Sequence, residues 1–382
     1  MLPVDLPGTV RDALLAPLVD HHCHGVRRDE LSRAGFELLI SPSGAPAPPG
    51  TTHFDTPLGA AIRRWCAPVL DLEPHTSAAV YLSRRAELGA DEANRRLLRA
   101  AGVMAILVDT GLESAELLSA AEMGRHSGAA IDEIVRIEQI EQDVAEMAQA
   151  AVDYLDSLAE ELAARAARSV GMTTVIAYRC GLGFDPSRPT RGAAIAAANQ
   201  RLSDPKARLT DPILLRHLLW AAVDVARERG LPVQFHTGLG GDPDVDLHRA
   251  DPARMTGFIR ALQPIGVPVV LLHCYPFHRQ AAYLAAAYPH VYADVGLALT
   301  HTAAGSARVM DELLELTPFH KLLYSSDCHG VAETCLLGAL TFRRALAGAL
   351  KWRIEAGEWS AADAARIAHM IGSGSARRIY RL

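Results

Sequence analysis

Short apolar runs alternate with longer amphipathic stretches along most of this chain. Eight runs have strand length: Leu18–His22, Val103–Val108, Ile134–Ile137, Thr173–Ala177, Val233–Phe235, Val267–Leu272, Val291–Val295 and Leu322–Ser325. Stretches with helical spacing follow the later runs: Ser114–Met123, Gln139–Arg168, Gly192–Leu202, Pro212–Arg229, Pro252–Leu262, Arg279–Tyr288, Ser306–Leu316 and Ala332–Leu350. This alternation predicts an α/β fold of βα units with a parallel sheet. Eight strands in 382 residues favour a (β/α)8 TIM barrel over an open doubly wound sheet, and no Gly-x-Gly-x-x-Gly follows a strand.

The segment from residue 27 to residue 101 does not show this alternation of strand-like and helix-like stretches. It contains the Pro, Gly and Ser-rich stretch Ser41–Gly50, followed by the helix-like runs Leu58–Val69 and Asp91–Ala101. A long excursion directly after the first strand is more often a lid than a separate domain. We therefore predict one barrel domain over residues 1–382, with residues 27–101 as a mainly helical insertion or lid after strand one.

Histidine and aspartate end four of the predicted strands. The first strand ends in the alternate residues His22 and His24, whose side chains point the same way on a strand. His236, His273 and Asp327 follow the fifth, sixth and eighth strands. A single histidine at a strand end is usually a packing or capping residue. Because the carboxyl ends of barrel strands meet at one rim, four such ends indicate a metal site.

These residues resemble the pattern of the amidohydrolase superfamily, which has Asp-x-His-x-His on strand one and single His, His and Asp on strands five, six and eight. Asp20 completes the first motif. More narrowly, the chain resembles the amidohydrolase-2 group, which includes the barrel domain fused to glutamine synthetase in some plant and fungal proteins. The supporting segments are Arg136–Glu138, Ala177–Leu182, His236–Gly238 and Ser326–Glu333.

The resemblance implies a metal held by His22, His24, His236 and Asp327. Many two-metal members bridge their ions with a carboxylated lysine at the end of strand four. The corresponding region here, residues 171–178, contains no lysine, which favours one divalent transition metal, with zinc as the expected ion. Glu138 on strand three could bridge two ions instead, so a two-metal site remains the alternative.

A cation with an open position lowers the pKa of bound water from ~15.7 towards ~7. We expect Asp327 to accept a proton from that water and pass it to a leaving group. By resemblance to one-metal members, His273 would orient the hydroxide or polarise the substrate carbonyl. Asp20 would either fix the tautomers of the paired histidines or be a strand-end carboxylate without such a role.

Five residues near the predicted rim are candidates for substrate binding: Arg136, Glu138, Tyr178, Arg179 and Glu333. Arg179, with its neighbour Tyr178, follows strand four, and Arg136 ends strand three. A guanidinium can hold a substrate carboxylate with two hydrogen bonds. Arg136 could equally form an internal ion pair, for instance with Glu138. Glu333 begins the helix after strand eight, where it could bind a substrate ammonium or favour the helix amino terminus.

The leading hypothesis is a metal-dependent amidohydrolase, an enzyme that cleaves a C–N amide bond with metal-activated water. The resemblance to the glutamine-synthetase-linked barrels implies a γ-glutamyl amide or another carboxylate-bearing small molecule as substrate. One alternative is non-oxidative decarboxylation, for which relatives use the same ligands. A non-catalytic metal-binding scaffold is a further alternative, disfavoured because storage of a metal does not require a base such as His273.

Composition narrows the class of partner. The net charge is −6 and the 21% of charged residues form no long runs, which argues against nucleic acid or an anionic membrane as partner. No stretch approaches ~18 uninterrupted apolar residues, and the amino terminus lacks a signal-peptide pattern. We therefore expect a cytoplasmic protein with a small-molecule substrate. The long stretch Gln139–Arg168 is most simply explained by core packing, with a contact surface for a homo-oligomer as the alternative. The six cysteines include no Cys-x-x-Cys pair and are predicted to be reduced packing residues.

Overall fold

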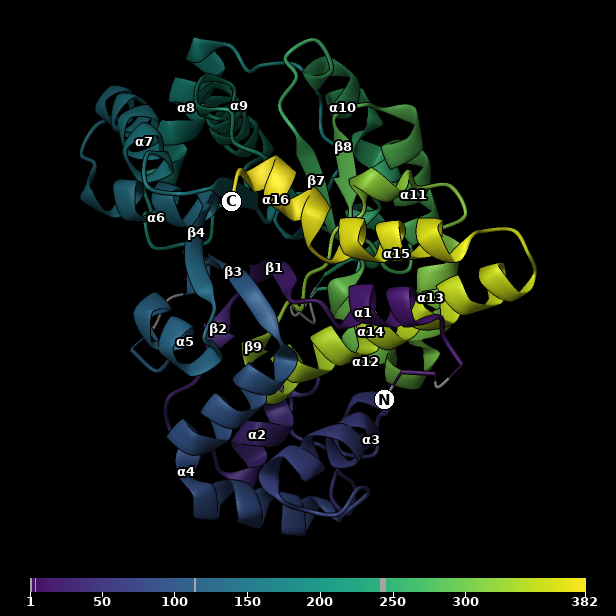
Figure 1. The fold of residues 1–382 in the computed structure, drawn as a ribbon. Helices are drawn as coiled ribbons and strands as arrows, with labels where there is room; N and C mark the ends of the chain where they lie inside the picture. The colour runs from purple at the N-terminus through teal and green to yellow at the C-terminus, as the bar shows by residue number, and fades with distance from the viewer. Residues whose placement is uncertain (1, 4, 113–114, 241–244) are drawn as a thin grey trace.

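The computed structural model describes residues 2–3, 5–112, 115–240 and 245–382. Its main sheet has seven parallel strands in the spatial order β1-β3-β4-β5-β6-β7-β8 (Figure 1). These strands are β1 (Leu18–Cys23), β3 (Val103–Asp109), β4 (Ala130–Arg136), β5 (Gly171–Thr174), β6 (Val233–Thr237), β7 (Val269–His273) and β8 (Val291–Ala293). Strands that are neighbours in the sheet are also consecutive in the chain, apart from the short β2, as βα units require.

The eighth predicted run, Leu322–Ser325, closes the barrel without forming a regular strand. The backbone N–H of Leu323 donates to the carbonyl of Ala293 at 3.2 Å, and the N–H of His21 donates to the carbonyl of Tyr324 at 3.1 Å. The run therefore lies between β8 and β1, and it joins the two edges of the curled sheet. The prediction of a (β/α)8 barrel is confirmed.

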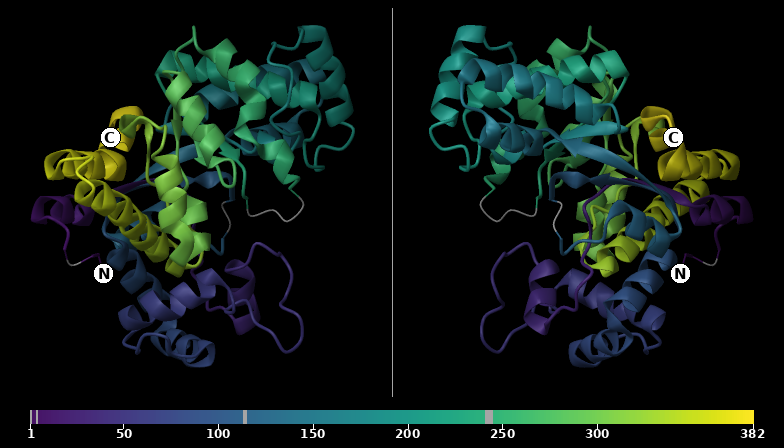
Figure 2. Two further views of the ribbon diagram at one scale, coloured as in Figure 1. Left: turned by 90° about the vertical axis from the view of Figure 1, so that its right-hand side faces the viewer. Right: turned by 90° about the vertical axis from the view of Figure 1, so that its left-hand side faces the viewer.

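Helices pack against the outer side of the sheet (Figures 1 and 2). They are α1 (Gly8–Leu15), α5 (Ala120–Ser127), α6 (Ile137–Met147), α7 (Ala151–Ala166), α8 (Arg191–Arg201), α9 (Pro212–Arg229), α10 (Thr256–Leu262), α11 (His278–Ala287), α12 (Gly296–Thr302), α13 (Ser306–Leu313), α14 (Ala332–Glu355) and α15 (Ala361–His369). The last helix, α16 (Ser375–Tyr380), lies at one end of the barrel. Most of these helices agree with the predicted stretches to within a few residues. Ser114, where one predicted helix begins, lies outside the described residues.

The prediction of a single helix over Gln139–Arg168 was wrong, because this stretch contributes to two helices, α6 and α7. The backbone of Ala148 and Ala150 is extended, so the helical hydrogen bonds stop between them. Both helices bury apolar side chains in the same core, which is why the apolar spacing continues across the break. The two helices are also joined by the hydroxyl of Tyr154, which donates to the buried carboxylate of Glu141 at 2.8 Å.

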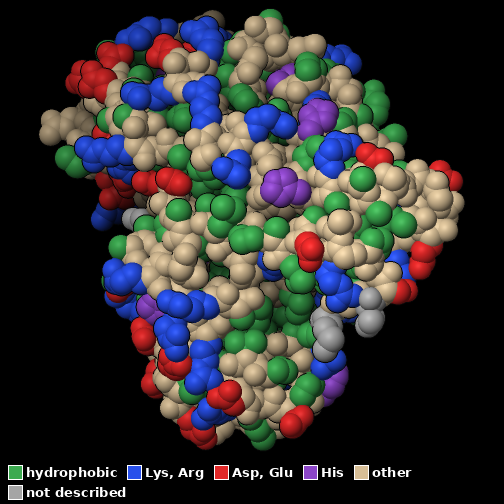
Figure 3. Space-filling view, viewed as in Figure 1, with side chains coloured by type: hydrophobic (Ala, Val, Ile, Leu, Met, Phe, Trp, Pro, Cys, Tyr) green, Lys and Arg blue, Asp and Glu red, His purple; other side chains and the backbone are tan. Residues whose placement is uncertain are grey.

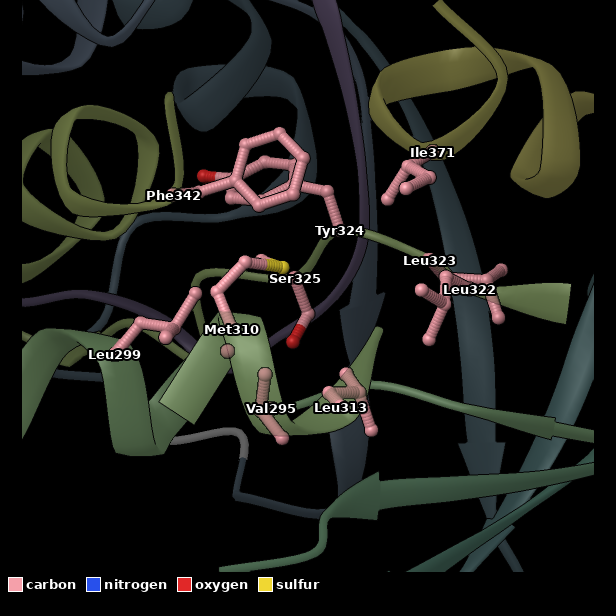
Figure 4. A pocket seen from close by; sticks show the side chains of 11 residues that line it. Val295, Leu299, Met310, Leu313, Leu322, Leu323, Tyr324, Ser325, Phe342 and Ile371 are labelled. Atoms are coloured by element: carbon pink, nitrogen blue, oxygen red, sulfur yellow. The ribbon is translucent and has the colours of Figure 1, made fainter. Parts of the chain in front are cut away.

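The barrel interior is filled by side chains. Val19, Leu107 and Leu272 pack there with Ile379 and Tyr380 of α16, so the C-terminal helix closes the amino-terminal end of the barrel. A separate apolar cavity of about 10 Å³ lies between the eighth run and helices α12 to α14, and Figure 4 shows the side chains that line it. That volume holds about one water molecule, so this cavity is not a substrate site.

A group of helices connects the short strand β2 (Gly25–Val26) to β3. They are α2 (Arg33–Leu39), α3 (Pro57–Ala61), a π-helical turn (Ile62–Cys66), a 3₁₀ turn (Ala67–Leu70) and α4 (Ala78–Ala101). They lie together at the lower end of the molecule in Figures 1 and 2. Arg85 of α4 forms a buried ion pair with Glu333 of α14 at 2.8 Å, and the hydroxyl of Tyr81 donates to the same carboxylate at 2.8 Å. These contacts attach the insertion to the barrel; its action as a lid remains a prediction.

The cysteine prediction was wrong at one pair. Cys328 and Cys335 form a disulfide, with their Cα atoms 4.9 Å apart. The remaining cysteines are free: Cys23, Cys66, Cys180 and Cys274. The chain after Asp327 folds back through the short strand β9 (His329–Gly330), which pairs with β2, and this brings the first turn of α14 against Cys328.

Acidic and basic side chains are interspersed over the face of the molecule seen in Figure 3. This mixed charge agrees with the absence of long charge runs in the sequence. Among the described residues, no helix combines the length and the apolar character that crossing a bilayer requires.

Candidate metal centre

The side chains predicted to bind metal meet at one end of the barrel. The Nε2 atoms of His22 and His24 each lie 3.3 Å from Oδ1 of Asp327. The imidazole ring of His236 lies 5.0 Å from that of His22, measured between ring centroids. Ligand atoms that are each ~2.1 Å from one ion lie within ~4.2 Å of one another. The measured distances between His22, His24 and Asp327 meet this condition.

Three of these ligand atoms are buried without a hydrogen-bond partner among the described residues: Nε2 of His22, Nε2 of His236 and Oδ1 of Asp327. Buried polar atoms in folded proteins are nearly always paired, because leaving them unpaired costs free energy. A cation that accepts their lone pairs would satisfy all three. The side chains present therefore fit a bound divalent metal.

The pKa shifts of Asp327 and His236 also suit a metal. Burial by itself would raise the pKa of Asp327, but the neighbouring imidazoles of His273, His22 and His24 favour its ionised form and hold this pKa well below its usual range. Burial lowers the pKa of His236 well below the ordinary value. An ionised carboxylate and a neutral imidazole are the forms that bind cations.

Two of the predicted catalytic side chains stand on unusual backbone. His273 and Asp327 have φ values of +66° and +51°, in the left-handed region that residues other than glycine rarely adopt. The N–H of His273 is held by Oδ1 of Asp294 at 2.8 Å, and the N–H of Asp327 by the carbonyl of His22 at 3.1 Å. Strained backbone of this kind clusters at functional sites, where the surroundings keep it in place.

His273 lies between a predicted ligand and the predicted base. Its Nε2 is 3.1 Å from Nδ1 of His236, and its Nδ1 is 3.8 Å from Oδ2 of Asp327. Nδ1 of His273 is itself buried without a hydrogen-bond partner among the described residues. The imidazole therefore contacts His236 and presents a buried nitrogen without a partner towards Asp327.

Asp109 is a further residue of this site that the sequence reasoning missed. It ends β3, and its Oδ2 lies 3.6 Å from Nδ1 of His24 and 3.8 Å from Nε2 of His236. Nη2 of Arg136 donates to the same oxygen at 2.5 Å. The signal was present, because Asp109 directly follows the predicted run Val103–Val108, as the other site residues follow theirs.

The ion pair of Asp109 answers a question that the sequence left open. Arg136 pairs with Asp109 and not with Glu138. Burial would raise the pKa of Asp109, but Arg136 holds it well below its usual range. Gly111 packs directly against this arginine, where an added Cβ atom would lie 2.3 Å from its Cδ. Arg136 is therefore an internal ion-pair partner beside the centre.

The strand-four candidates lie around Glu138. Oε1 of Glu138 accepts hydrogen bonds from the hydroxyl of Thr174 at 2.5 Å and the N–H of Val175 at 3.0 Å. Its Oε2 is buried without a partner among the described residues. Burial lowers the pKa of Arg179, and the charge of Glu138 opposes this shift. The ring of Tyr178 lies 5.9 Å from that of His236 between centroids, so this segment reaches the metal centre.

Two further carboxylates make structural contacts. Glu333 was expected to bind a substrate ammonium or to favour the helix amino terminus; it lies in the first turn of α14, where it is fully buried against Arg85. Asp20 was expected either to fix the tautomers of the paired histidines or to be a strand-end carboxylate without such a role. Its carboxylate accepts hydrogen bonds from the backbone N–H of Ser326 at 2.8 Å and from the Ser326 hydroxyl at 2.5 Å. It thus fixes the strand-eight end that carries Asp327.

The barrel and its cluster of buried histidines and aspartates indicate a metal-binding barrel protein. The family described as Amidohydrolase matches residues 133–382. The chain therefore belongs to the amidohydrolase family, as the resemblance implied, and this membership supports an enzyme.

The chain is also similar to individual proteins. Protein fluG of Emericella nidulans is 32% identical over 224 residues, a match that covers 56% of this chain and 26% of that protein. The chain thus spans about a quarter of the length of this curated relative. A candidate metal-dependent hydrolase from Lactobacillus casei has a TM-score of 0.85 at 24% identity over 98% of both chains. Uronate isomerase from Thermotoga maritima has a TM-score of 0.67 at 13% identity over 97% of both chains. At these identities the two structures show a shared fold alone.

Proposed function

We propose that this protein is a metal-dependent hydrolase that cleaves a C–N amide bond of a small molecule. The observation that carries the proposal is the convergence of unpaired, buried imidazole and carboxylate atoms at one end of the barrel. Membership of the amidohydrolase family supports the class of reaction. The proposed setting is the cytoplasm, a proposal that rests on the composition of the chain.

His22, His24, His236 and Asp327 would hold one divalent cation, with zinc as the proposed ion. When bound, such a cation supplies Lewis acidity that activates water and polarises a carbonyl oxygen. Asp327 would accept a proton at its carboxylate and return it to the departing amine. His273, 3.8 Å from Oδ2 of Asp327, would orient the reacting groups by hydrogen bonding.

The proposed substrate carries a carboxylate, as a γ-glutamyl amide does. Arg179 supports this choice because its Nε is buried without a hydrogen-bond partner among the described residues. It directly follows Tyr178, which touches His236. Its Nη1 makes one long contact, 3.4 Å, to the carbonyl of Leu209. Buried N–H groups that lack an acceptor favour an anion that can supply one.

The direct test is a screen of γ-glutamyl and N-acyl amides with the purified, metal-loaded protein. Release of ammonia or an amine supports the proposal. Release of CO2 from aromatic or enoic acids, without amide cleavage, would instead assign the protein to the decarboxylases. Binding of metal without turnover of either class would leave only the scaffold function.

We expect the purified protein to contain close to one zinc or similar transition metal per chain. The four-ligand set and the absence of a lysine on strand four are the reasons. Elemental analysis measures this content, and removal of the metal with a chelator should abolish activity until zinc is restored. Two metals per chain at full occupancy would contradict the one-metal form and point to Glu138 as a bridge.

Arg179→Met should weaken turnover of carboxylate-bearing amides. Removing the guanidinium leaves the substrate anion desolvated and unpaired. The activation free energy should rise by roughly 2–5 kcal/mol, which is measured as a decrease in kcat/KM. The neutral ester or amide of the same compound should react almost as before. Arg191→Met is a matched control, because this arginine is exposed on α8 in an ion pair with Asp156. Equal losses for charged and neutral substrates would show that Arg179 has a structural role.

A further inference from the structure

A chain of buried hydrogen bonds runs from the candidate metal centre to the C-terminal helix α16. It contains His22 and His21 of β1, Gln234 of β6, Tyr380 of α16 and Asp294, which follows β8. Four side-chain hydrogen bonds connect these residues, and each joins two elements that are far apart in the sequence. All five residues are buried, and Gln234 is 0% exposed.

The orientation of the Gln234 amide follows from one backbone atom. Its Nε2 lies 2.9 Å from the carbonyl oxygen of His21. A carbonyl oxygen only accepts hydrogen bonds, so the atom that faces it must be the amide nitrogen. The amide oxygen then faces Nδ1 of His22 at 2.8 Å. Because this oxygen also only accepts, Nδ1 of His22 must carry the proton.

The consequence for His22 is a single tautomer. A neutral imidazole with its proton on Nδ1 has its lone pair on Nε2. Nε2 is the atom 3.3 Å from Oδ1 of Asp327, and it has no hydrogen-bond partner among the described residues. Gln234 therefore directs the lone pair of His22 into the candidate metal centre.

The directions of the hydrogen bonds at the other end of this network follow in the same way. The Tyr380 hydroxyl accepts from Nε2 of Gln234 at 2.8 Å, so its own proton is available for Nδ1 of His21 at 3.1 Å. Nε2 of His21 then donates to Oδ2 of Asp294 at 2.7 Å. Oδ1 of Asp294 holds the backbone N–H of His273 at 2.8 Å. Each donor meets an acceptor, so no side chain of this network can rotate to the flipped orientation without losing a hydrogen bond.

We propose that Gln234 and Tyr380 are positioning residues that hold His22 in the tautomer able to bind metal through Nε2. This inference rests on the metal site of the proposed function. It also gives α16 a role beyond closing the barrel, because its tyrosine orients the amide. Loss of such a hydrogen-bond partner typically lowers metal affinity about 10–100-fold.

The experiment measures the zinc Kd of the full-length protein by competition with a chromophoric chelator, together with the unfolding midpoint of the metal-free protein. Gln234→Met keeps the shape of the side chain but removes the acceptor, and it should raise the Kd about 10–100-fold. Gln234→Glu keeps an oxygen for Nδ1 of His22 but loses the amide N–H groups that face the His21 carbonyl and the Tyr380 hydroxyl, so it should weaken zinc binding less than Gln234→Met does. Tyr380→Phe should weaken zinc binding less than Gln234→Met. Tyr154→Phe, which removes a buried hydroxyl from α7, is the control and should leave the Kd unchanged.

Equal Kd values for Gln234→Met and the unchanged protein would overturn the inference while the metal site stands. So would equal losses of affinity in the Met and Glu variants, because a merely structural glutamine predicts that result. If the unchanged protein binds no zinc, the proposed function itself fails. Nitrogen-15 NMR of the metal-free protein tests the tautomer even if a variant does not fold. His22 protonated on Nδ1 supports the inference, and His22 protonated on Nε2 overturns it.

Discussion

Replacing His236 with alanine is expected to remove most of the bound metal and all measurable turnover, whereas His273→Asn is expected to leave the metal and remove turnover. Nε2 of His236 is one of the unpaired atoms of the centre, and alanine offers no substitute ligand. His273 instead bridges His236 and Asp327. Loss of a proton-transfer group typically lowers kcat about 10²–10⁴-fold.

Asparagine is the appropriate replacement at position 273, because it tolerates the left-handed backbone that His273 adopts better than most residues do. Metal content per chain and kcat are measured on the same preparations. If both variants lose metal equally, His273 is itself a ligand and the proposed set must be revised.

Arg85→Met is expected to destabilise the protein by about 3–5 kcal/mol, because it leaves the carboxylate of Glu333 buried without its charge partner. The side chains of Arg85 and Glu333 are 6% and 0% exposed. The hydroxyl of Tyr81 would remain as a partner of Glu333, but it carries no charge. The loss should appear in the urea unfolding midpoint and in faster proteolysis of the helical insertion.

The neighbouring residue provides the matched control. Arg84 lies on the same helix, but it pairs with Asp71 and Glu87 at the protein surface. Exposed pairs of this kind contribute about 0–1 kcal/mol, so Arg84→Met should change the midpoint little. Similar losses in the two variants would mean that the ion pair with Glu333 does not anchor the insertion.

The fold and the list of site candidates could be read from the sequence for the same reason. The apolar periods that mark strands and helices are local, and in a barrel every strand delivers its terminal residues to one rim. His22, His24, His236 and Asp327 could therefore be grouped without knowing their coordinates. Asp109 also ends a strand, β3, and belongs with these residues for the same reason.

Helix boundaries were predicted less well where two helices share one core. The apolar spacing of α6 continues into α7, and no proline or glycine marks the extended residues between them. Their separation is decided by packing and by the contact between Tyr154 and Glu141. A local pattern does not contain that information.

The sequence by itself determined the barrel class, the family and the strand ends at which chemistry was expected. Only the tertiary structure decided which polar and charged side chains face one another. Arg136 meets Asp109, Arg85 meets Glu333 and Gln234 meets His22, and these last two pairs are 248 and 212 residues apart along the chain. The physical reason is that strand and helix periods arise from neighbouring residues, whereas ion pairs and hydrogen bonds depend on distances that exist only after the chain has folded.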